Sequence, residues 1–203
     1  MAADLEIRTA AKGDHARIST VLGRAFQVEP VYQWLFPDPA VRARRLGLLL
    51  GTFVRHLHAG LGTVEVATAD GTIVGVALWD GPGATDPGSL RTLRALPGMF
   101  LATRGKLLKL AMLGSKLDGF RPTEPHWYLS HLGADPDRQA RGVGTALLRE
   151  RLAPCDAAGL PAYLECKPSH VGYYERFGFQ VRNEVVVDET LSMLAMWREP
   201  AAT

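Results

Sequence analysis

Two glycines in one short segment are the residues whose type and spacing most directly suggest chemistry. Gly142 and Gly144 follow an apolar segment and come directly before an amphipathic one that starts at Thr145. The first turn of a helix leaves backbone N–H groups without intrahelical partners, and the helix dipole adds partial positive charge there. Glycine also lets a ligand approach the backbone closely. The pattern predicts a phosphate site, to which Arg138 and Arg141 add formal charge.

Other phosphate-binding loops fit this segment poorly. A dinucleotide-binding loop needs a third glycine where Leu147 stands, and a P-loop needs a Gly-Lys-Ser or Gly-Lys-Thr sequence that this segment lacks. An ordinary strand-to-helix turn that uses glycine for its positive φ stays open as the alternative.

The strand expected before this loop, at about residues 126–134, contains Gly133. Glycine inside a strand often marks a bulge or a close backbone approach. A bulge would separate this strand from a parallel neighbour and expose backbone groups to an extended ligand that carries amides. A ligand with a diphosphate at one end and an amide-bearing arm at the other, such as coenzyme A, fits both features.

A third pattern lies about thirty residues after the loop, where Tyr173 and Tyr174 precede the sequence Glu-Arg-Phe-Gly-Phe. A phenol, with a pKa of about 10, is well matched to protonate a thiolate of similar basicity. Taken alone, the two tyrosines are more typical of packing residues on a helix.

Together these motifs resemble those of the GNAT superfamily of N-acetyltransferases. The run from Leu129 to Gly144 contains the Gln/Arg-x-x-Gly-x-Gly/Ala core of its acetyl-CoA motif, and Tyr174 to Phe179 resembles its Tyr-Glu-x-x-Gly-Phe ending. The resemblance implies acetyl-CoA as the cosubstrate, no metal, and Tyr174 as the general acid, with Tyr173 as the substitute candidate. It also implies contacts with acetyl-CoA along the strand and the loop, at Leu132, Gly133, Ala134, Arg138, Gln139, Ala140, Arg141, Gly142, Val143, Gly144 and Thr145.

A narrower resemblance concerns the acceptor side. The segments at 24–39, 123–129 and 163–165 are similar to the puromycin N-acetyltransferase branch, which does not imply that puromycin is the substrate. It implies an acceptor pocket walled by the aromatic side chains of Phe26, Tyr32 and Trp34. Aromatic residues at such spacing are otherwise more typical of a core.

The base that deprotonates the incoming ammonium is harder to assign. Strict strand alternation puts Tyr128, Ser130 and Leu132 on one face. His131 would then point the other way. Tyr128 stands where many relatives carry a Glu base, and Glu165 ends the neighbouring strand, from which it would act directly or through water. A surface or paired carboxylate is an equal alternative for Glu165.

The order of expected elements describes one N-acetyltransferase domain over residues 1–203. A hairpin at Asp70-Gly71 predicts antiparallel pairing in the first half, and a β-loop-α-β unit in the second half predicts parallel pairing. The expected fold class is α/β (α+β), with a GNAT-like mixed sheet of about seven strands, flanked by helices and splayed at the acetyl-CoA site. Residues 5–125 would form the acceptor side and residues 126–199 the acetyl-CoA side.

A helical insertion is expected at about residues 89–118, cut at Pro97-Gly98. It is basic, and we expect a solvated face on two core helices rather than a membrane-surface helix or a lid. His56 and His58, which precede it, lack the i, i+4 spacing of a metal pair and are expected on a helix surface.

Composition narrows the classes of function. The chain has 203 residues, 47% of them hydrophobic, and a net charge of +2. This is ordinary for a globular protein and too weakly charged to indicate a nucleic-acid partner. No run reaches the roughly 18 apolar residues of a membrane span, and the N-terminus does not resemble a signal peptide. We therefore expect a cytoplasmic protein and leave a homodimer open.

The leading hypothesis is an acetyl-CoA-dependent N-acetyltransferase that transfers an acetyl group to a primary amine of a small molecule by direct attack. One alternative is a protein N-terminal or lysine acetyltransferase. The other is a non-catalytic sensor that binds acyl-CoA.

Overall fold

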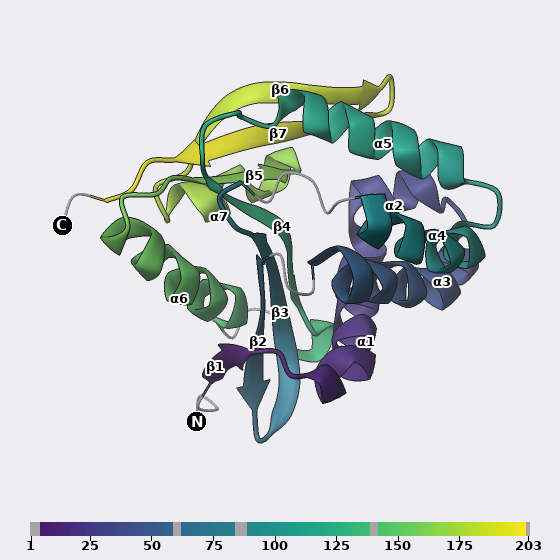
Figure 1. The fold of residues 1–203 in the computed structure, drawn as a ribbon, viewed down its shortest axis with the longest axis horizontal. Coiled ribbons are helices and arrows are strands. Elements are labelled where there is room, and N and C mark those ends of the chain that lie inside the picture. The colour runs from purple at the N-terminus through teal and green to yellow at the C-terminus, as the bar shows by residue number, and fades with distance from the viewer. Residues whose placement is uncertain (1–4, 59–61, 84–88, 139–141, 202–203) are drawn as a thin grey trace.

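A mixed sheet divides the molecule, with helices on both of its faces (Figure 1). The computed structural model describes residues 5–58, 62–83, 89–138 and 142–201. Seven strands are ordered β1-β2-β3-β4-β5-β7-β6, and in the described residues β4 and β5 are the one parallel pair. The α/β prediction with a mixed sheet is confirmed. The strands are β1 (Glu6–Thr9), β2 (Gly62–Ala69), β3 (Thr72–Asp80), β4 (Trp127–Ala134), β5 (Ala162–Cys166), β6 (Gln180–Asp188) and β7 (Leu191–Arg198).

The first half of the sheet is antiparallel, as the hairpin motif predicts. β2 and β3 are joined by Asp70 and Gly71, whose φ angles of 51° and 70° are both left-handed. Such a pair of angles matches the twist of the flanking strands, which explains the Asp-Gly sequence. β3 then pairs with β4, so the antiparallel half leads directly to the strand before the glycine loop.

The parallel pair is short, and β4 leaves β5 after three residues. Trp127, Tyr128 and Leu129 pair with β5, whereas the rest of β4 continues along β3 to Ala134. The expected splay is therefore present. A bulge is present as well, but its extra residue is Ser130, because Leu78 lies opposite His131 while Trp79 lies opposite Leu129.

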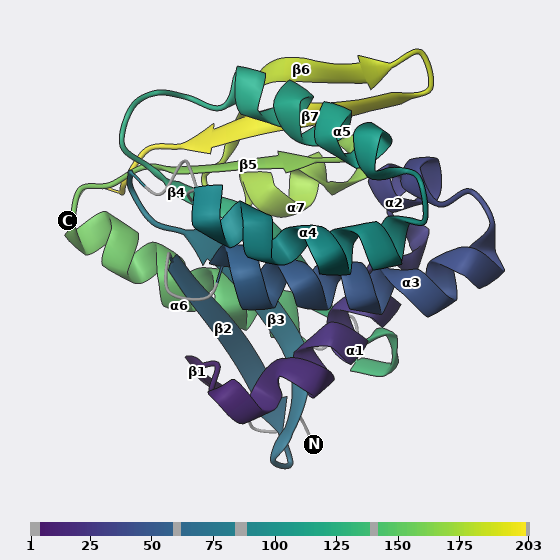
Figure 2. The ribbon, with the colours of Figure 1, turned by 45° about the vertical axis from the view of Figure 1, so that its right-hand side comes forward.

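Helices α1 to α5 cover one face of the sheet, and α6 and α7 cover the other (Figures 1 and 2). Asp38 caps α3 by accepting from the N–H groups of Ala40 and Val41, and Pro39 occupies the first helical position. A π-helical turn, η3 (Phe53–His58), follows α3. The helices are α1 (His15–Ala25), α2 (Pro30–Leu35), α3 (Pro39–Thr52), α4 (Ser89–Thr103), α5 (Leu107–Phe120), α6 (Val143–Ala157) and α7 (Val171–Glu175).

The helical insertion consists of α4 and α5, but it is not cut at Pro97-Gly98. Pro97 lies inside α4, and the chain breaks at Arg104 and Gly105, whose φ angles of 44° and 89° end the helix. Lys106 and Lys109 then hold α5 against α2, because they donate to the carbonyls of Leu35 and Trp34 at 3.1 and 2.8 Å.

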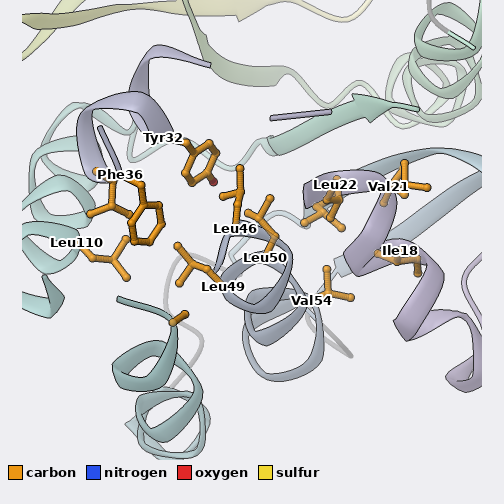
Figure 3. Close-up of a cluster of buried hydrophobic side chains, with 14 of the residues drawn as sticks. Ile18, Val21, Leu22, Tyr32, Phe36, Leu46, Leu49, Leu50, Val54 and Leu110 are labelled. Carbon is orange, nitrogen blue, oxygen red and sulfur yellow. The ribbon is translucent and has the colours of Figure 1, made fainter. Parts of the chain in front are cut away.

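Two large apolar clusters fill the space on either side of the sheet. The larger lies between the sheet and α1 to α5, where Leu22, Leu46, Leu49 and Leu50 are fully buried (Figure 3). The second lies under α6 and α7. A smaller third cluster consists of Tyr128, Tyr163, Val185, Ala195 and Trp197. The outward face of the insertion is also partly apolar: Leu93, Phe100 and Leu108 are 61%, 63% and 86% exposed.

Candidate active site

The glycine loop forms the N-terminus of α6. Gly142 has a φ of 81°, and nothing lies within 4 Å of the place where its Cβ would be. In the described residues no side chain caps this end of the helix, and the first intrahelical bond runs from the Ala146 N–H to the Gly142 carbonyl at 2.9 Å. By helix geometry, the N–H groups of Val143 to Thr145 are left for another acceptor. The backbone can therefore bind an anion here.

Neighbouring side chains fix this end of α6. Val143 is buried and packs against Gly75 of β3, where any side chain would collide with it. The hydroxyl of Tyr173 lies 2.8 Å from the point where a Cβ on Gly144 would stand. Gly144 therefore makes room for Tyr173. Three expected contact residues, Gln139, Ala140 and Arg141, lie outside the described residues.

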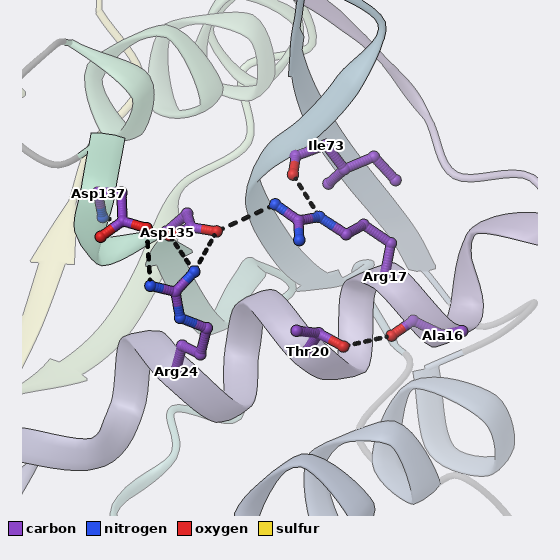
Figure 4. Close-up of polar contacts among 7 residues, drawn as sticks. All are labelled: Ala16, Arg17, Thr20, Arg24, Ile73, Asp135 and Asp137. Carbon is purple, nitrogen blue, oxygen red and sulfur yellow. Dashed lines mark hydrogen bonds and ion pairs between the residues drawn. The ribbon is translucent and has the colours of Figure 1, made fainter.

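A cluster of ion pairs anchors the turn between β4 and α6 (Figure 4). The Asp135 carboxylate is buried and receives Arg17 at 3.0 Å and Arg24 at 2.8 Å, both from α1. Arg24 also reaches Asp137 at 2.9 Å. These contacts neutralise the acidic groups that would otherwise repel a phosphate, and they tie the turn, including Arg138, to α1.

The residue pattern fits acetyl-CoA, an extended molecule with an amide-bearing arm and a diphosphate. From Ser130 to Ala134, β4 has no partner on β5 in the described register, and this edge leads directly to the uncapped end of α6. Leu132 and Ala134 turn their side chains to the α6 face. Gly133 lies against α1, and a Cβ there would stand 3.0 Å from both Ala25 and Phe26.

The two tyrosines of α7 lie on the α6 face of the sheet. Tyr174 is 8% exposed, and burial raises its pKa, with Cys166 and Glu29 adding to the shift. The phenol therefore stays protonated, and its raised pKa makes it a weaker acid than a free tyrosine, so its match to a thiolate is less close than that of an unperturbed phenol. Tyr173 lies instead over the first turn of α6; burial raises its pKa, and a hydrogen bond with Thr145 opposes the shift.

Glu165 and Tyr128 come together on the opposite face. Burial raises the pKa of Glu165, while hydrogen bonds from Tyr128 and Tyr163 and the charge of Arg121 oppose that shift. Among the described residues, Glu165 Oε1 has no hydrogen-bond partner. Arg121 lies over the Tyr128 ring, 4.0 Å from its centroid. Glu165 is thus half-buried, with one carboxylate oxygen fully covered, and is paired with phenols.

The bulge changes which side chains face the acceptor side. Because Ser130 is an extra residue, the Leu132 side chain lies on the α6 face, as that of Leu129 does. The His131 side chain points toward α1 and α2. The expectation that Tyr128 and Leu132 share a face is therefore wrong, and so is the expected orientation of His131. The His131 ring lies 5.3 Å from that of Phe26, and its Nε2 is 2.6 Å from the Tyr32 hydroxyl.

The three expected wall residues separate into two places. Phe26 and Tyr32 pack edge to face at 5.6 Å beside His131. Trp34 lies apart from them: its indole N–H donates to Asp188 of β6, and Lys109 sits 3.8 Å above its ring.

Sequence reasoning also missed two residues that the fold brings to this place. His58 is not on a helix surface; it is 6% exposed, and its Nδ1 lies 2.7 Å from the Asp80 carboxylate. The sequence places His58 at the end of a helix but does not say which face of that helix is buried. In the structure η3 ends beside β3, and this contact buries the imidazole. One signal in the sequence could have pointed to this pair: the apolar strand β3 ends in an acidic residue, Asp80, which could partner a nearby histidine.

Among the residues that the structure describes, no group of three or more His, Cys, Asp or Glu side chains is arranged to hold a metal ion. None of the described helices combines the length and the apolar character that crossing a membrane requires.

Comparisons with known proteins agree with this geometry. The model of the acetyltransferase (GNAT) family matches residues 28–179. An uncharacterized N-acetyltransferase of Schizosaccharomyces pombe is 28% identical over 202 residues, which cover 92% of this chain and 80% of that protein.

Two solved structures share the fold. A crystal structure from Corynebacterium glutamicum, described as histone acetyltransferase HPA2 and related acetyltransferase, has a TM-score of 0.75, 26% identity and 98% coverage of both chains. A GNAT family acetyltransferase from Brucella melitensis, in complex with acetyl-CoA, has a TM-score of 0.50 and 20% identity, covering 95% of this chain and 87% of that one. Because the family model spans more than half of the chain, this protein belongs to the acetyltransferase (GNAT) family and is an acyltransferase that uses acetyl-CoA.

Proposed function

We propose that this enzyme transfers the acetyl group of acetyl-CoA to the primary amine of a small molecule by direct attack. One observation carries the proposal: β4 runs on past β5 and leads into the uncapped end of α6. The free strand edge pairs with the amides of the pantetheine arm, and the helix end binds the diphosphate. Both features lie in one continuous segment. A cofactor bound along it would therefore have its thioester at the point where β4 and β5 separate.

The cofactor contacts follow from that segment. Leu132, Gly133 and Ala134 offer their backbone to the arm, and the N–H groups from Gly142 to Thr145 bind the diphosphate. Arg138, at the end of the anchored turn, adds a salt contact. Gln139, Ala140 and Arg141 complete the loop in this proposal.

The chemical roles divide between the two faces of the sheet. The amine nitrogen attacks the thioester carbonyl carbon, so that a C–N bond forms and the C–S bond breaks. A strand N–H near Leu132 stabilises the negative oxygen of the tetrahedral intermediate. Tyr174 gives its phenolic proton to the departing thiolate. Glu165 and Tyr128, on the opposite face, lie on the amine side.

The acceptor side supports a small substrate. The aromatic rings of Phe26 and Tyr32 stand against β4, and the insertion is fastened across α2 by Lys106 and Lys109. An extended peptide would need an uncovered groove beside the splay. We accordingly propose that residues 5–125 supply most of the acceptor wall and residues 126–199 the acetyl-CoA site. The resemblance to the puromycin N-acetyltransferase branch involves residues of this acceptor wall. It does not identify a particular substrate.

Release of free thiol from acetyl-CoA tests this function directly. The panel consists of aminoglycosides, polyamines, amino acids and a lysine-containing peptide, and products are checked by mass spectrometry. We expect acetylation of at least one small primary amine. Acetylation of the peptide alone would favour a protein acetyltransferase, and tight binding of acetyl-CoA without turnover on any amine would favour a sensor.

A further inference from the structure

A chain of hydrogen bonds links five side chains on the acceptor face of β4. The Tyr32 hydroxyl lies 2.6 Å from His131 Nε2, and His131 Nδ1 lies 2.7 Å from the Ser130 hydroxyl. Ser130 Oγ lies 3.5 Å from His58 Nε2, the longest link. His58 Nδ1 lies 2.7 Å from Asp80 Oδ1. The members come from α2, β4, η3 and β3, so the fold alone brings them together.

The donors of this chain can point in one direction only. A carboxylate only accepts, so His58 Nδ1 donates to Asp80, and in the neutral imidazole Nε2 must then accept. Ser130 donates its one proton to that nitrogen and accepts from His131 Nδ1. His131 Nε2 is left to accept from Tyr32. Every proton therefore points from Tyr32 toward Asp80, which is the order that a relay requires.

The two ends of the chain meet different surroundings. At the Tyr32 end, Phe26 and the free segment of β4 adjoin the place proposed for the amine. At the other end, Asp80 lines a cavity of about 130 Å³, together with Arg121, Glu124 and Tyr128. A proton that enters beside the thioester can thus leave on the other side of η3.

We propose that this chain is a proton relay, which takes the proton of the substrate ammonium at Tyr32 and delivers it to His58 beside Asp80. The inference rests on the proposed function, because an ammonium must lose a proton before its nitrogen attacks a thioester. The N–H bond of the ammonium breaks while a new O–H bond forms on Tyr32, whose own proton moves to His131 Nε2. The Nδ1 proton of His131 moves to Ser130, and the Ser130 proton moves to His58 Nε2. His58 then carries the positive charge beside the Asp80 carboxylate until solvent in the cavity accepts the proton.

The electrostatics agree with transfer through a neutral His131. Burial lowers the pKa of His131 to about 3, and the neighbouring His58 adds to the shift. The imidazole therefore exchanges one ring proton for another and does not store charge. Two further charged groups face the chain: Glu29, at the start of α2, acts on Tyr32, and the Arg121 guanidinium lies near Asp80. In this scheme Tyr32 is the group that touches the amine, and Ser130 and His58 act through it.

Substitution of Ser130 tests the relay in the middle, away from the substrate. We expect Ser130→Ala to lower kcat about 10- to 100-fold at pH 7 while the Kd of acetyl-CoA stays unchanged. The loss should shrink as pH rises toward the pKa of the amine, because the free amine then needs no base. Ser130→Thr keeps the hydroxyl and should keep most of the activity. Ser192→Ala, at a half-buried serine of β7, is the matched control. A loss that is equal at every pH, or no loss, contradicts the relay.

A second measurement does not depend on turnover. Nitrogen-15 NMR of the imidazoles reports which ring nitrogen carries the proton. The relay requires the Nδ1–H tautomer in both His58 and His131, and an Nε2–H tautomer of His131 would overturn it. If the tautomers are as expected but no amine is acetylated, the proposed function fails. The hydrogen-bonded chain is then confirmed, but it carries no substrate proton. If an amine is acetylated and the tautomers differ, the relay alone fails.

Discussion

The two faces of β4 are built differently, although both serve one reaction in the proposed mechanism. On the α6 face, the proposed binding groups belong to the backbone: the strand edge from Ser130 to Ala134, which lies beyond the described pairing with β5, and the N–H groups that follow Gly142. On the acceptor face, the groups of the proposed relay are side chains drawn from four separate segments, including His58 and Asp80. A backbone site leaves a local glycine pattern in the sequence, whereas a side-chain network leaves none.

This difference explains why only one of the two faces is readable from motifs. Gly142 needs its left-handed φ of 81°, and few other residues would tolerate it, so residue type and structure are tied together. A histidine at position 58 is compatible with many structures. His58 takes its place in the proposed relay only because η3 lies next to Asp80 of β3 and Ser130 of β4.

The first and largest effect tests the proton donor on the α6 face. Tyr174→Phe keeps the ring packed against Phe179 but removes the hydroxyl. We expect kcat to fall by about 10²- to 10³-fold, because the thiolate then leaves without a general acid. Stopped-flow and steady-state assays of thiol release measure the loss, and calorimetry should show an unchanged Kd for acetyl-CoA. Tyr173→Phe is the matched comparison, and a larger loss there would reassign the acid.

A second change addresses the phosphate site. Gly142→Glu places a carboxylate beside the diphosphate and should weaken acetyl-CoA binding by about 100-fold, or roughly 3 kcal/mol. Gly159→Glu is the control, because Gly159 ends the same helix with a φ of 64° and also has open space around it. It imposes the same backbone strain and charge at the other end of α6. Equal losses in both variants would attribute the effect to strain.

On the acceptor face, His131 should make stability depend on pH. Its folded pKa is lowered to about 3, whereas an unfolded histidine titrates near 6.5. Below pH 6.5 the unfolded chain takes up a proton that the folded chain does not, so stability is full above 6.5 and falls toward pH 3. At pH 5.5 this residue accounts for about 1 kcal/mol.

Urea unfolding at pH 7.5 and 5.5 measures that contribution. The decrease in unfolding free energy between the two pH values should be about 1 kcal/mol smaller in His131→Asn than in the wild type. His15, His126 and His170, whose pKa values are also lowered by burial, are common to both proteins and cancel in the difference. An identical decrease would mean that His131 is protonated in the folded enzyme.

The smallest expected effect separates two aromatic residues that looked equivalent in the sequence. Trp34→Phe should change the KM of the amine less than about two-fold, since Trp34 is held by Asp188 and Lys109, away from β4. Phe26→Ala should raise that KM about ten-fold, because it removes apolar contact beside His131. Steady-state kinetics with the best amine of the panel decides between them, and the reverse order would return Trp34 to the pocket wall.

The fold was predictable to the extent that local chemistry determines it. The Asp70-Gly71 turn and the start of α6 both follow from residues adjacent in the chain, whereas the splay was expected correctly but from a bulge at Gly133 that lies at Ser130 instead. The break in the insertion was misplaced, because Pro97 is accommodated within α4 while two left-handed residues, Arg104 and Gly105, end it. Proline is the stronger sequence signal, yet the helix stops at the left-handed φ angles of Arg104 and Gly105.

The acceptor side was predictable only in part, for a geometric reason. One extra residue at Ser130 reverses the alternation of every side chain after it. Strict alternation therefore assigned Leu132 and His131 to the wrong faces, and the second of these errors hid the hydrogen-bonded chain. A bulge of this kind depends on how β3 and β4 pair, which the sequence of β4 does not contain.

Nuclear magnetic resonance during a titration with coenzyme A tests the central claim most directly. If the edge of β4 and the end of α6 form one binding site, the largest backbone amide shifts should fall at Leu132, Ala134 and Gly142 to Thr145, and in Gly142→Glu they should require about 100-fold more coenzyme A. Unchanged amides at these positions, with the largest shifts elsewhere on the molecule, would contradict the account.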